Sequence, residues 1–403
     1  MARAVAWCAP ARLLSAAASS GMEMARIYLD YAATTPLRPE AARAAAVLSA
    51  AGNPSSLHAE GRAARAAVDE ARELLARVLG CAPREVVFTA GGTDAAALAV
   101  LGAARAAGDG GHVVVSAIEH RAVLHAAQAL EAEGRRVTRV PVGTDGRIDV
   151  REFAAALTRG TVLASVMLGN NEIGTLQPVA ELAALARERG ILFHTDAVQA
   201  AGWLALDVDA LGVDLLSLSA HKFHGPKGVG ALYVRRGAAV LPLAGGGGQE
   251  SGLRGGTENV AGIAAMAAAL GAAEAERPEA APRVAALRDR LQAGLVAAIP
   301  DVVVNGAAAP RLPGILSLAF GDVPSDALLM RLDLEGIAAS AGSACAAGSL
   351  EPSHVTAALG LPERFRRGTV RFSLGRATTE AEIDEVIARL PGLLADIRMP
   401  LTV

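Results

Sequence analysis

The 403-residue sequence contains few aromatic residues and few cysteines. Phe, Trp and Tyr make up 3% of the chain, while hydrophobic residues make up 52%, so its cores must be built largely from Ala, Val and Leu. The three cysteines, Cys8, Cys81 and Cys345, are too few and too scattered for a disulfide framework or a zinc site. A reducing compartment fits this pattern, and we therefore expect a cytoplasmic protein.

The sequence also lacks an excess of charge and a long apolar run. A net charge of -3 leaves no electrostatic footprint for nucleic acid or for an anionic membrane. The longest apolar run, VAGIAAMAAALGAA from Val260, is too short to span a membrane. Residues 1–23 resemble a poor signal or transit peptide, but Met22 and Met24 precede the first strand-like run. We therefore expect residues 1–23 to be a disordered or misassigned extension.

Short apolar strands alternate with helices through the first two thirds of the chain, from EVVFT at residues 85–89 to ALYV at 231–234. This alternation predicts an α/β fold with a mainly parallel sheet covered by helices. Residues 264–300 are helical, with an expected break at Arg277-Pro278, and a smaller α/β domain follows. We predict a large domain at 40–278 and a small domain at 24–39 plus 279–403.

The stretch DLLSLSAHKFHGPKGVG at residues 214–230 joins a buried strand to a loop with reactive side chains. A lysine just past a buried strand is desolvated, which lowers its pKa and makes its amine more nucleophilic. Lys222 is therefore a candidate for the Schiff-base lysine of a pyridoxal phosphate (PLP) enzyme. The alternative is a surface loop whose lysines are merely solvated. The other polar residues at this break are Ser219, His221, His224 and Lys227.

Further polar residues follow other predicted strands, where ligands bind in parallel sheets. In FTAGGTDAAALA, a glycine turn and a helix start could bind phosphate together with Thr93, unless Thr93 is only an N-cap. Asp196 could pair with a protonated pyridine nitrogen or cap a helix, and Gln199 lies one helical turn further on. His120 could stack on the ring and handle protons, or be structural. Asn171 could bind ligand or form a turn.

Three later segments add candidates. GGGGQESGLRGGTEN carries Arg254 and Thr257 and could be a second phosphate contact or a flexible linker. Cys345 lies in a run of Ala, Gly and Ser, which indicates an exposed thiol whose reactivity is used. An unperturbed thiol is only a few per cent ionised at pH 7, and no neighbour in the loop supplies an obvious base. Arg371 could bind a substrate carboxylate or form a surface ion pair.

Taken together, these segments resemble the cysteine desulfurases of the NifS/IscS type, which have the aspartate-aminotransferase fold of PLP enzymes (fold type I). The likeness runs from Ile27 to about Ile383. It rests on the motifs YLDYAATTPL, GNPSSLHAEGR, NNEIG, HTDAVQA, SAHKFHGPKGVGALYVRR, LRGGTEN, SAGSAC, GSLEPSHV and RFSLGR. The long version of the cysteine loop is similar to the subgroup whose loop carries sulfur out to acceptors.

The resemblance implies a role for each matching residue. Lys222 would form the Schiff base and take the Cα proton, and His120 would stack on the ring. Cys345 would attack the substrate sulfur, and it is a candidate transient iron–sulfur ligand; no other metal site is implied. Arg371 would bind the substrate carboxylate, with Asn171 beside it. The implied cofactor contacts are Gly92, Thr93, His120, Asn171, Asp196, Gln199, Ser219, His221 and Lys222, with Thr257 supplied by the partner of a homodimer.

The activity that the resemblance implies is removal of sulfur from L-cysteine, giving L-alanine and a persulfide on Cys345. The sulfur would pass to an acceptor protein, either an iron–sulfur scaffold or a thiolation enzyme such as one acting on tRNA. A selenocysteine lyase or a PLP β-lyase on the same fold are the alternatives, and a catalytically idle sulfur-relay partner is a more remote one. After GGTD the chain has AAALA where family members often carry acidic and amide residues. Because the sequence stops at MPLTV, we expect it to lack the extra tail that some members use to dock a scaffold protein.

Overall fold

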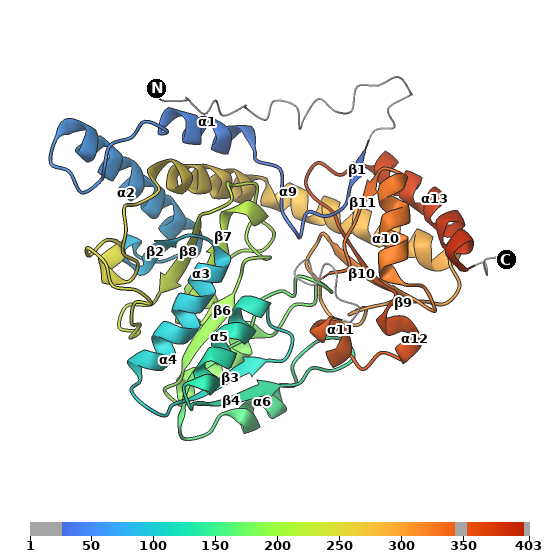
Figure 1. Ribbon diagram of the computed structural model, residues 1–403, viewed down its shortest axis with the longest axis horizontal. Helices are drawn as coiled ribbons and strands as arrows, with labels where there is room; N and C mark the ends of the chain where they lie inside the picture. Colours follow the sequence, from blue (N-terminus) through green and yellow to red (C-terminus); the bar gives the residue numbers. More distant parts are fainter. Residues whose placement is uncertain (1–25, 343–352, 399–403) are drawn as a thin grey trace, which may run out of the picture.

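The computed structural model describes residues 26–342 and 353–398. Its largest sheet in this part of the chain has seven strands in the order β2-β8-β7-β6-β5-β3-β4 (Figure 1). Five neighbouring strands run parallel, from β4 to β7, and β8 is antiparallel to both of its neighbours. The strands are β2 (Val86–Thr89), β3 (His112–Ser116), β4 (Arg136–Val140), β5 (Thr161–Ser165), β6 (Leu192–Asp196), β7 (Leu215–Ser219) and β8 (Gly230–Val234).

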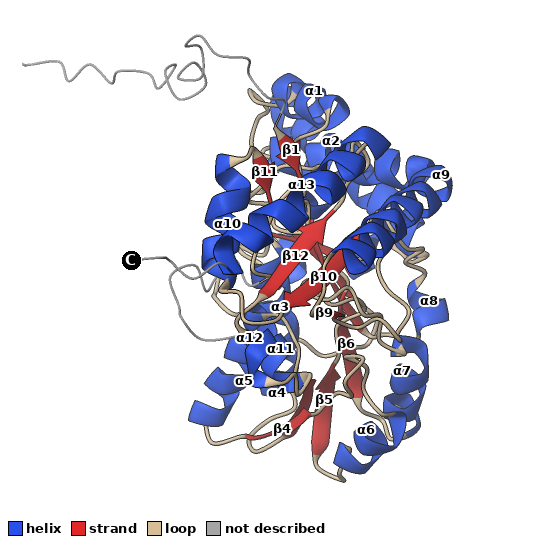
Figure 2. Cartoon of the chain, turned by 90° about the vertical axis from the view of Figure 1, so that its right-hand side faces the viewer, coloured by secondary structure: helices blue, strands red, loops and turns tan. Residues whose placement is uncertain are grey.

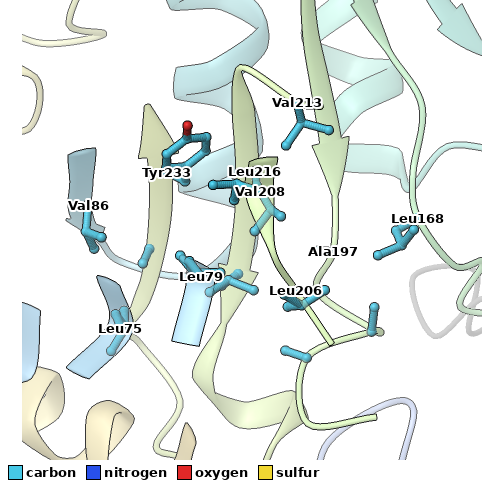
Figure 3. Close-up of a cluster of buried hydrophobic side chains, with 14 of the residues drawn as sticks. Leu75, Leu79, Val86, Leu168, Ala197, Leu206, Val208, Val213, Leu216 and Tyr233 are labelled. Carbon is cyan, nitrogen blue, oxygen red and sulfur yellow. The ribbon is translucent and has the colours of Figure 1, made fainter. Parts of the chain in front are cut away.

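Helices cover both faces of this sheet, because alternate residues of a strand point to opposite sides. Leu215 packs in a core with α3 (Gly92–Ala97), α4 (Ala103–Ala106) and α5 (Arg121–Ala132). Its neighbour Leu216 packs in a second core with α2 (Ala59–Leu79), α7 (Val179–Glu188) and the start of α9 (Val260–Ala298). Figure 3 shows part of the second core, with Leu216 near Leu79 of α2. The predicted α/β fold is confirmed.

A third core lies around a small antiparallel sheet in the order β12-β10-β9 (Figure 2). Its strands are β9 (Val302–Val304), β10 (Ile315–Phe320) and β12 (Thr369–Ser373). The N-terminal strand β1 (Ile27–Tyr28) pairs in parallel with β11 (Ile337–Ala338), and Ile27 and Leu29 are buried in the same core. The remaining helices are α1 (Pro39–Val47), α6 (Val150–Ala156), α8 (Val208–Leu211), α10 (Ser325–Leu334), α11 (His354–Ala358), α12 (Glu363–Arg366) and α13 (Glu380–Arg398).

Helix α9 corrects one expectation, because it continues through Pro278 and Pro282 where a break was predicted. Each proline removes a backbone donor and crowds the carbonyl four residues earlier, at about 3 kcal/mol in a helix interior. Burial at both ends offsets this, since Met266 packs in the core of the large sheet and Leu291 in the third core. The predicted domain boundary at 278/279 thus falls inside one helix, and the division into domains stays a prediction.

Within the residues described, no helix is both long and apolar enough to cross a membrane.

Candidate active site

A cavity of about 300 Å³ lies where β3, β5, β6 and β7 end, beside the segments that follow β1 and β11. Parallel strands bring their carboxyl ends to one edge of a sheet, so residues far apart in the sequence meet there. Ten of the residues expected from the sequence line this cavity: Gly92, Thr93, His120, Asn171, Asp196, Gln199, Ser219, His221, Lys222 and Arg371. The structure therefore gathers most of the predicted set in one place.

Lys222 reaches the cavity from a single 3₁₀ turn, Ala220–Lys222, that directly follows β7. Its Nζ donates hydrogen bonds to the carbonyl oxygens of Ala32 at 2.6 Å and Ala33 at 2.8 Å. Gln199 donates to the same Ala32 oxygen at 2.9 Å. The segment after β1 therefore orients the amine at the cavity wall.

Asp196 is the last residue of β6 and is only 6% exposed. Its Oδ1 accepts a hydrogen bond from the Val198 amide at 2.9 Å. Burial raises the pKa of this carboxyl, while His120, the Val198 amide and Lys222 oppose the rise. A buried carboxylate of this kind favours a cationic ligand group beside it.

His120 caps the N-terminus of α5, and its Nδ1 accepts a hydrogen bond from the Ala122 amide at 3.1 Å. Since Nδ1 accepts, the neutral ring carries its proton on Nε2. Burial lowers the pKa of His120, Asp196 opposes this, and Lys222 reinforces it. The arrangement favours a neutral imidazole that can both cover a ring and exchange a proton.

The expected phosphate end of the cavity is built around Gly92, the first residue of α3. A Cβ at Gly92 would lie 3.0 Å from Val198 Cγ2 and 3.1 Å from Ser219 Cβ, so a larger residue would crowd this wall. The free amides of a helix start, with the hydroxyls of Thr93 and Ser219, form a donor set suited to an anion. His221 lies beside them, and burial together with Lys222 and Lys227 lowers its pKa to about 4.

Arg371 also lines the cavity; it lies on β12, and its side chain is 2% exposed. Its Nη2 donates to Asp30 Oδ1 at 2.8 Å, and its Nη1 donates to the carbonyl oxygens of Asn171 at 2.7 Å and Gly342 at 3.0 Å. These contacts fix the guanidinium plane, and among the described residues they leave one Nη2 hydrogen and the buried Nε–H without a partner. The fork is thus already oriented by protein groups from three segments.

Sequence reasoning missed several residues in the cavity wall or directly behind it. Glu119 is fully buried and holds the Met167 amide at 2.7 Å, and burial raises its carboxyl pKa well above the ordinary value. Arg121, Glu172 and His354 line the cavity. Glu119 and Arg121 flank His120 in the sequence, and Glu172 follows Asn171, so proximity to predicted residues was the available signal.

One predicted residue, Thr257, lies elsewhere, and a second, Cys345, is not described. Thr257 is exposed and does not line the cavity of its own chain, and neighbouring Arg254 pairs with Asp94 at 3.6 Å. Cys345 lies outside the described residues; Gly342 and Ser353 are the residues described nearest to it on either side. Among residues 26–342 and 353–398, no group of three or more His, Cys, Asp or Glu side chains could hold a metal ion.

The fold and the site define the chain as a member of a PLP-enzyme class. The family model for class-V aminotransferases matches residues 27–386, so the chain belongs to that family. Its members depend on PLP, and this chain's cavity fits that group: it offers a buried carboxylate, a lysine amine and a crowded glycine turn with anion donors.

Comparison with known proteins places the chain more narrowly within this family. The chain is 45% identical over 375 residues to "Cysteine desulfurase IscS" of Dictyoglomus turgidum, covering 92% of this chain and 95% of the relative. A solved "NIFS-like protein" superposes with a TM-score of 0.86 at 35% identity, covering 92% of this chain and all of the other. The structure described as "SspA in complex with cysteine" gives a TM-score of 0.77 at 36% identity, with coverages of 88% and 100%. The resemblance to cysteine desulfurases of the NifS/IscS type is confirmed.

Proposed function

We propose that this chain is a PLP-dependent cysteine desulfurase that converts L-cysteine to L-alanine and passes the sulfur to an acceptor. The observation that carries the proposal is the cavity itself, which gathers ten of the expected residues from both parts of the fold. The relatives with that activity cover almost the whole chain, which supports the same conclusion.

Different residues around the cavity would bind different parts of the cofactor. Bound PLP supplies an electron sink for the charge that develops at the substrate Cα. Asp196 would keep a proton on the ring nitrogen, and Asn171 and Gln199 would bind the ring hydroxyl. The phosphate would be held by Gly92, Thr93, Ser219 and His221. His120 would cover the ring and keep water from it.

Lys222 and Arg371 would act on the substrate itself. Lys222 Nζ would anchor the cofactor and then accept the proton from the substrate Cα, since it is fixed at the wall by the Ala32 and Ala33 carbonyls. Arg371 would donate its remaining Nη2 hydrogen to the substrate carboxylate, with Asp30 holding the guanidinium in place. The substrate is thereby oriented at its Cα, through Lys222 and the cofactor, and at its carboxylate, through Arg371.

In this proposal, Cys345 takes the sulfur atom from the substrate. The Cys345 thiolate attacks the substrate sulfur, an S–S bond forms, and the Cβ–S bond breaks with its electron pair returning to the carbon framework. A proton added at Cβ completes L-alanine, and the enzyme keeps the sulfur as a persulfide. The acceptor is a second protein, either an iron–sulfur scaffold or a thiolation enzyme, and a reducing cytoplasm would keep Cys345 competent for each turnover.

The test compares two cysteine variants in an assay for alanine and protein-bound persulfide from L-cysteine. Cys345→Ala should keep the visible absorbance of bound PLP yet lose persulfide, with sulfur release falling to the background rate. Cys81→Ala is the matched control, because burial raises the pKa of the Cys81 thiol to about 12 and makes it a poor nucleophile. Undiminished sulfur transfer by Cys345→Ala would overturn the proposed sulfur route.

We also propose a homodimer. Thr257 is exposed and lies outside the cavity of its own chain, and the resemblance assigns it to the phosphate of the partner's site.

A further inference from the structure

The glycine-rich segment at residues 246–258, which we call the arm, folds back on itself beside α2 and β2 (Figure 1). A Cβ at Gly255 would lie 2.5 Å from Gly246 Cα. Gln249 Oε1 also accepts a hydrogen bond from the Gly256 amide at 3.1 Å. The absence of side chains at these glycines therefore lets the two halves of the arm pack backbone against backbone.

Glu250 binds the arm to α2 and β2. Its side chain is 3% exposed, and its Oε1 and Oε2 accept hydrogen bonds from the two terminal nitrogens of Arg72 on α2 at 2.7 and 2.8 Å. Oε2 also accepts a hydrogen bond from the Phe88 amide of β2 at 2.8 Å. Paired hydrogen bonds between a guanidinium and a carboxylate fix direction as well as distance. The arm is therefore joined to one helix and one strand through a single buried carboxylate.

The backbone of the arm is strained at this point. Glu250 and Ser251 have φ angles of 49° and 58°, in the left-handed region that residues other than glycine seldom adopt. Such conformations persist only where the surrounding contacts hold them in place. Glu250 makes those contacts with its side chain, whereas Ser251 is exposed. Weakening the pair between Glu250 and Arg72 should therefore let this part of the arm move.

A second buried carboxylate holds the arm where it joins α9. The side chain of Glu258 is 2% exposed and accepts a hydrogen bond from Arg65 Nη2 of α2 at 2.5 Å. Arg254 also pairs with Asp94 at 3.6 Å, but both side chains are partly exposed, so this contact contributes little. Thr257 is exposed and lies between the two buried carboxylates in the sequence. Its hydroxyl is thus presented to solvent from a segment that is held on both sides.

We propose that Glu250 is a positioning residue for the partner's site: its pair with Arg72 holds the arm so that the Thr257 hydroxyl reaches the phosphate of PLP bound there. This rests on the proposed desulfurase function and on the proposed homodimer. A different route exists within one chain, because Phe88 lies on the strand that leads to the glycine turn of the phosphate end. The two routes place the effect of Glu250 in different subunits, so an experiment can separate them.

The first experiment is a double-mutant cycle in which PLP is titrated into the apoproteins and the absorbance of bound PLP is followed. Thr257→Ala should weaken PLP binding about tenfold, through loss of a hydrogen bond to a charged group. Glu250→Gln should weaken it about fivefold, because glutamine keeps one acceptor oxygen but loses the paired contact with Arg72. The double variant should bind PLP no more weakly than Thr257→Ala alone, since Glu250 acts only through Thr257.

Two further variants control this cycle. Glu131→Gln removes a paired contact of the same geometry, made with Arg139 at 2.8 and 2.7 Å outside the arm, and should leave the PLP affinity unchanged. Glu250→Asp keeps the charge but withdraws it by one methylene, so the chain should fold even if Glu250→Gln does not. Its PLP affinity should fall between those of the wild type and Thr257→Ala.

Mixed dimers show which subunit is affected. A Lys222→Ala chain has no lysine to bind PLP covalently, so the absorbance of PLP on Lys222 reports only the site of the intact chain. Glu250→Gln in the Lys222→Ala chain should weaken PLP binding at the reported site about fivefold. The same substitution in the chain that keeps Lys222 should leave the reported site unchanged, because the arm of that chain serves the silent site.

The possible failures have different meanings. If the wild type forms no alanine from L-cysteine, the proposed function falls. If it forms alanine but Thr257→Ala binds PLP as tightly as the wild type, the shared site falls. If Thr257→Ala weakens binding but the effects of Glu250→Gln and Thr257→Ala multiply, only the role of Glu250 is overturned. The same holds if the loss appears only in the chain that carries Glu250→Gln.

Discussion

Asp196 lies at the end of β6 with little solvent around it. Ionising its carboxyl therefore costs free energy in the protein without a bound ligand. Burial raises its pKa above the unfolded value, so the folded chain binds a proton more readily than the unfolded chain does. Stability from this group is therefore lost as pH rises through the folded pKa. A cationic ligand group beside Asp196 would reverse that penalty, which is what a protonated ring nitrogen provides.

Asp196→Asn should therefore weaken cofactor binding without lowering the stability of the apoprotein. Without PLP, removing the buried charge should leave the free energy of unfolding at pH 7 unchanged or raise it. With PLP, the loss of a charged partner should weaken binding by about tenfold to a hundredfold. Thermal unfolding and PLP titration of the apoprotein measure both effects. Equal PLP affinity in the variant would refute the assigned pairing with the ring nitrogen.

At the scale of the element, β8 positions the glycine turn on which the phosphate end is built. Gly230 begins β8 and pairs with Ser219 of β7 and Thr89 of β2. A Cβ at Gly230 would lie 2.6 Å from the Leu218 carbonyl oxygen and 2.7 Å from the Gly91 carbonyl carbon. Both neighbours are backbone, so no side chain can move to make room. Only glycine allows the three strands and the turn to approach this closely.

Gly230→Ala should lower the free energy of unfolding by about 1–3 kcal/mol and also weaken PLP binding, because overpacking displaces the Gly91 turn. The control is Gly160→Ala, where an added Cβ meets nothing within 4 Å. Chemical denaturation and PLP titration of the two variants measure the effects side by side. If the Gly230→Ala protein is as stable as Gly160→Ala, then β2, β7 and β8 can move apart without loss of stability.

At the scale of the whole molecule, the alternation of strands and helices was enough to predict the parallel sheet, because each segment carries its own periodicity. The ends of those strands also pointed to Asp196, Ser219 and Lys222. Contacts made by the backbone could not be predicted in this way: the Ala32 and Ala33 carbonyls that bind Lys222 come from a segment nearly 190 residues earlier. Such contacts depend on tertiary packing and leave no local pattern.

The prediction of a helix break at Arg277-Pro278 failed for the same reason. Proline disfavours a helix interior locally, but α9 buries residues in two separate cores, and that energy is invisible in a short window of sequence. Glu172 was overlooked because neighbouring Asn171 carried the motif, and its burial at the cavity is a property of the folded site.

The proposed homodimer can be tested by complementation between two defective chains. Lys222→Ala should be inactive, and Thr257→Ala should bind PLP about tenfold more weakly through loss of a hydrogen bond to the charged phosphate. If Thr257 serves the partner's site, a mixed dimer regains one site with both residues intact. Coexpressed, differently tagged chains should then show more activity at limiting PLP than the mean of the two parents. Activity no higher than that mean, or a monomer in sedimentation, would exclude the shared site.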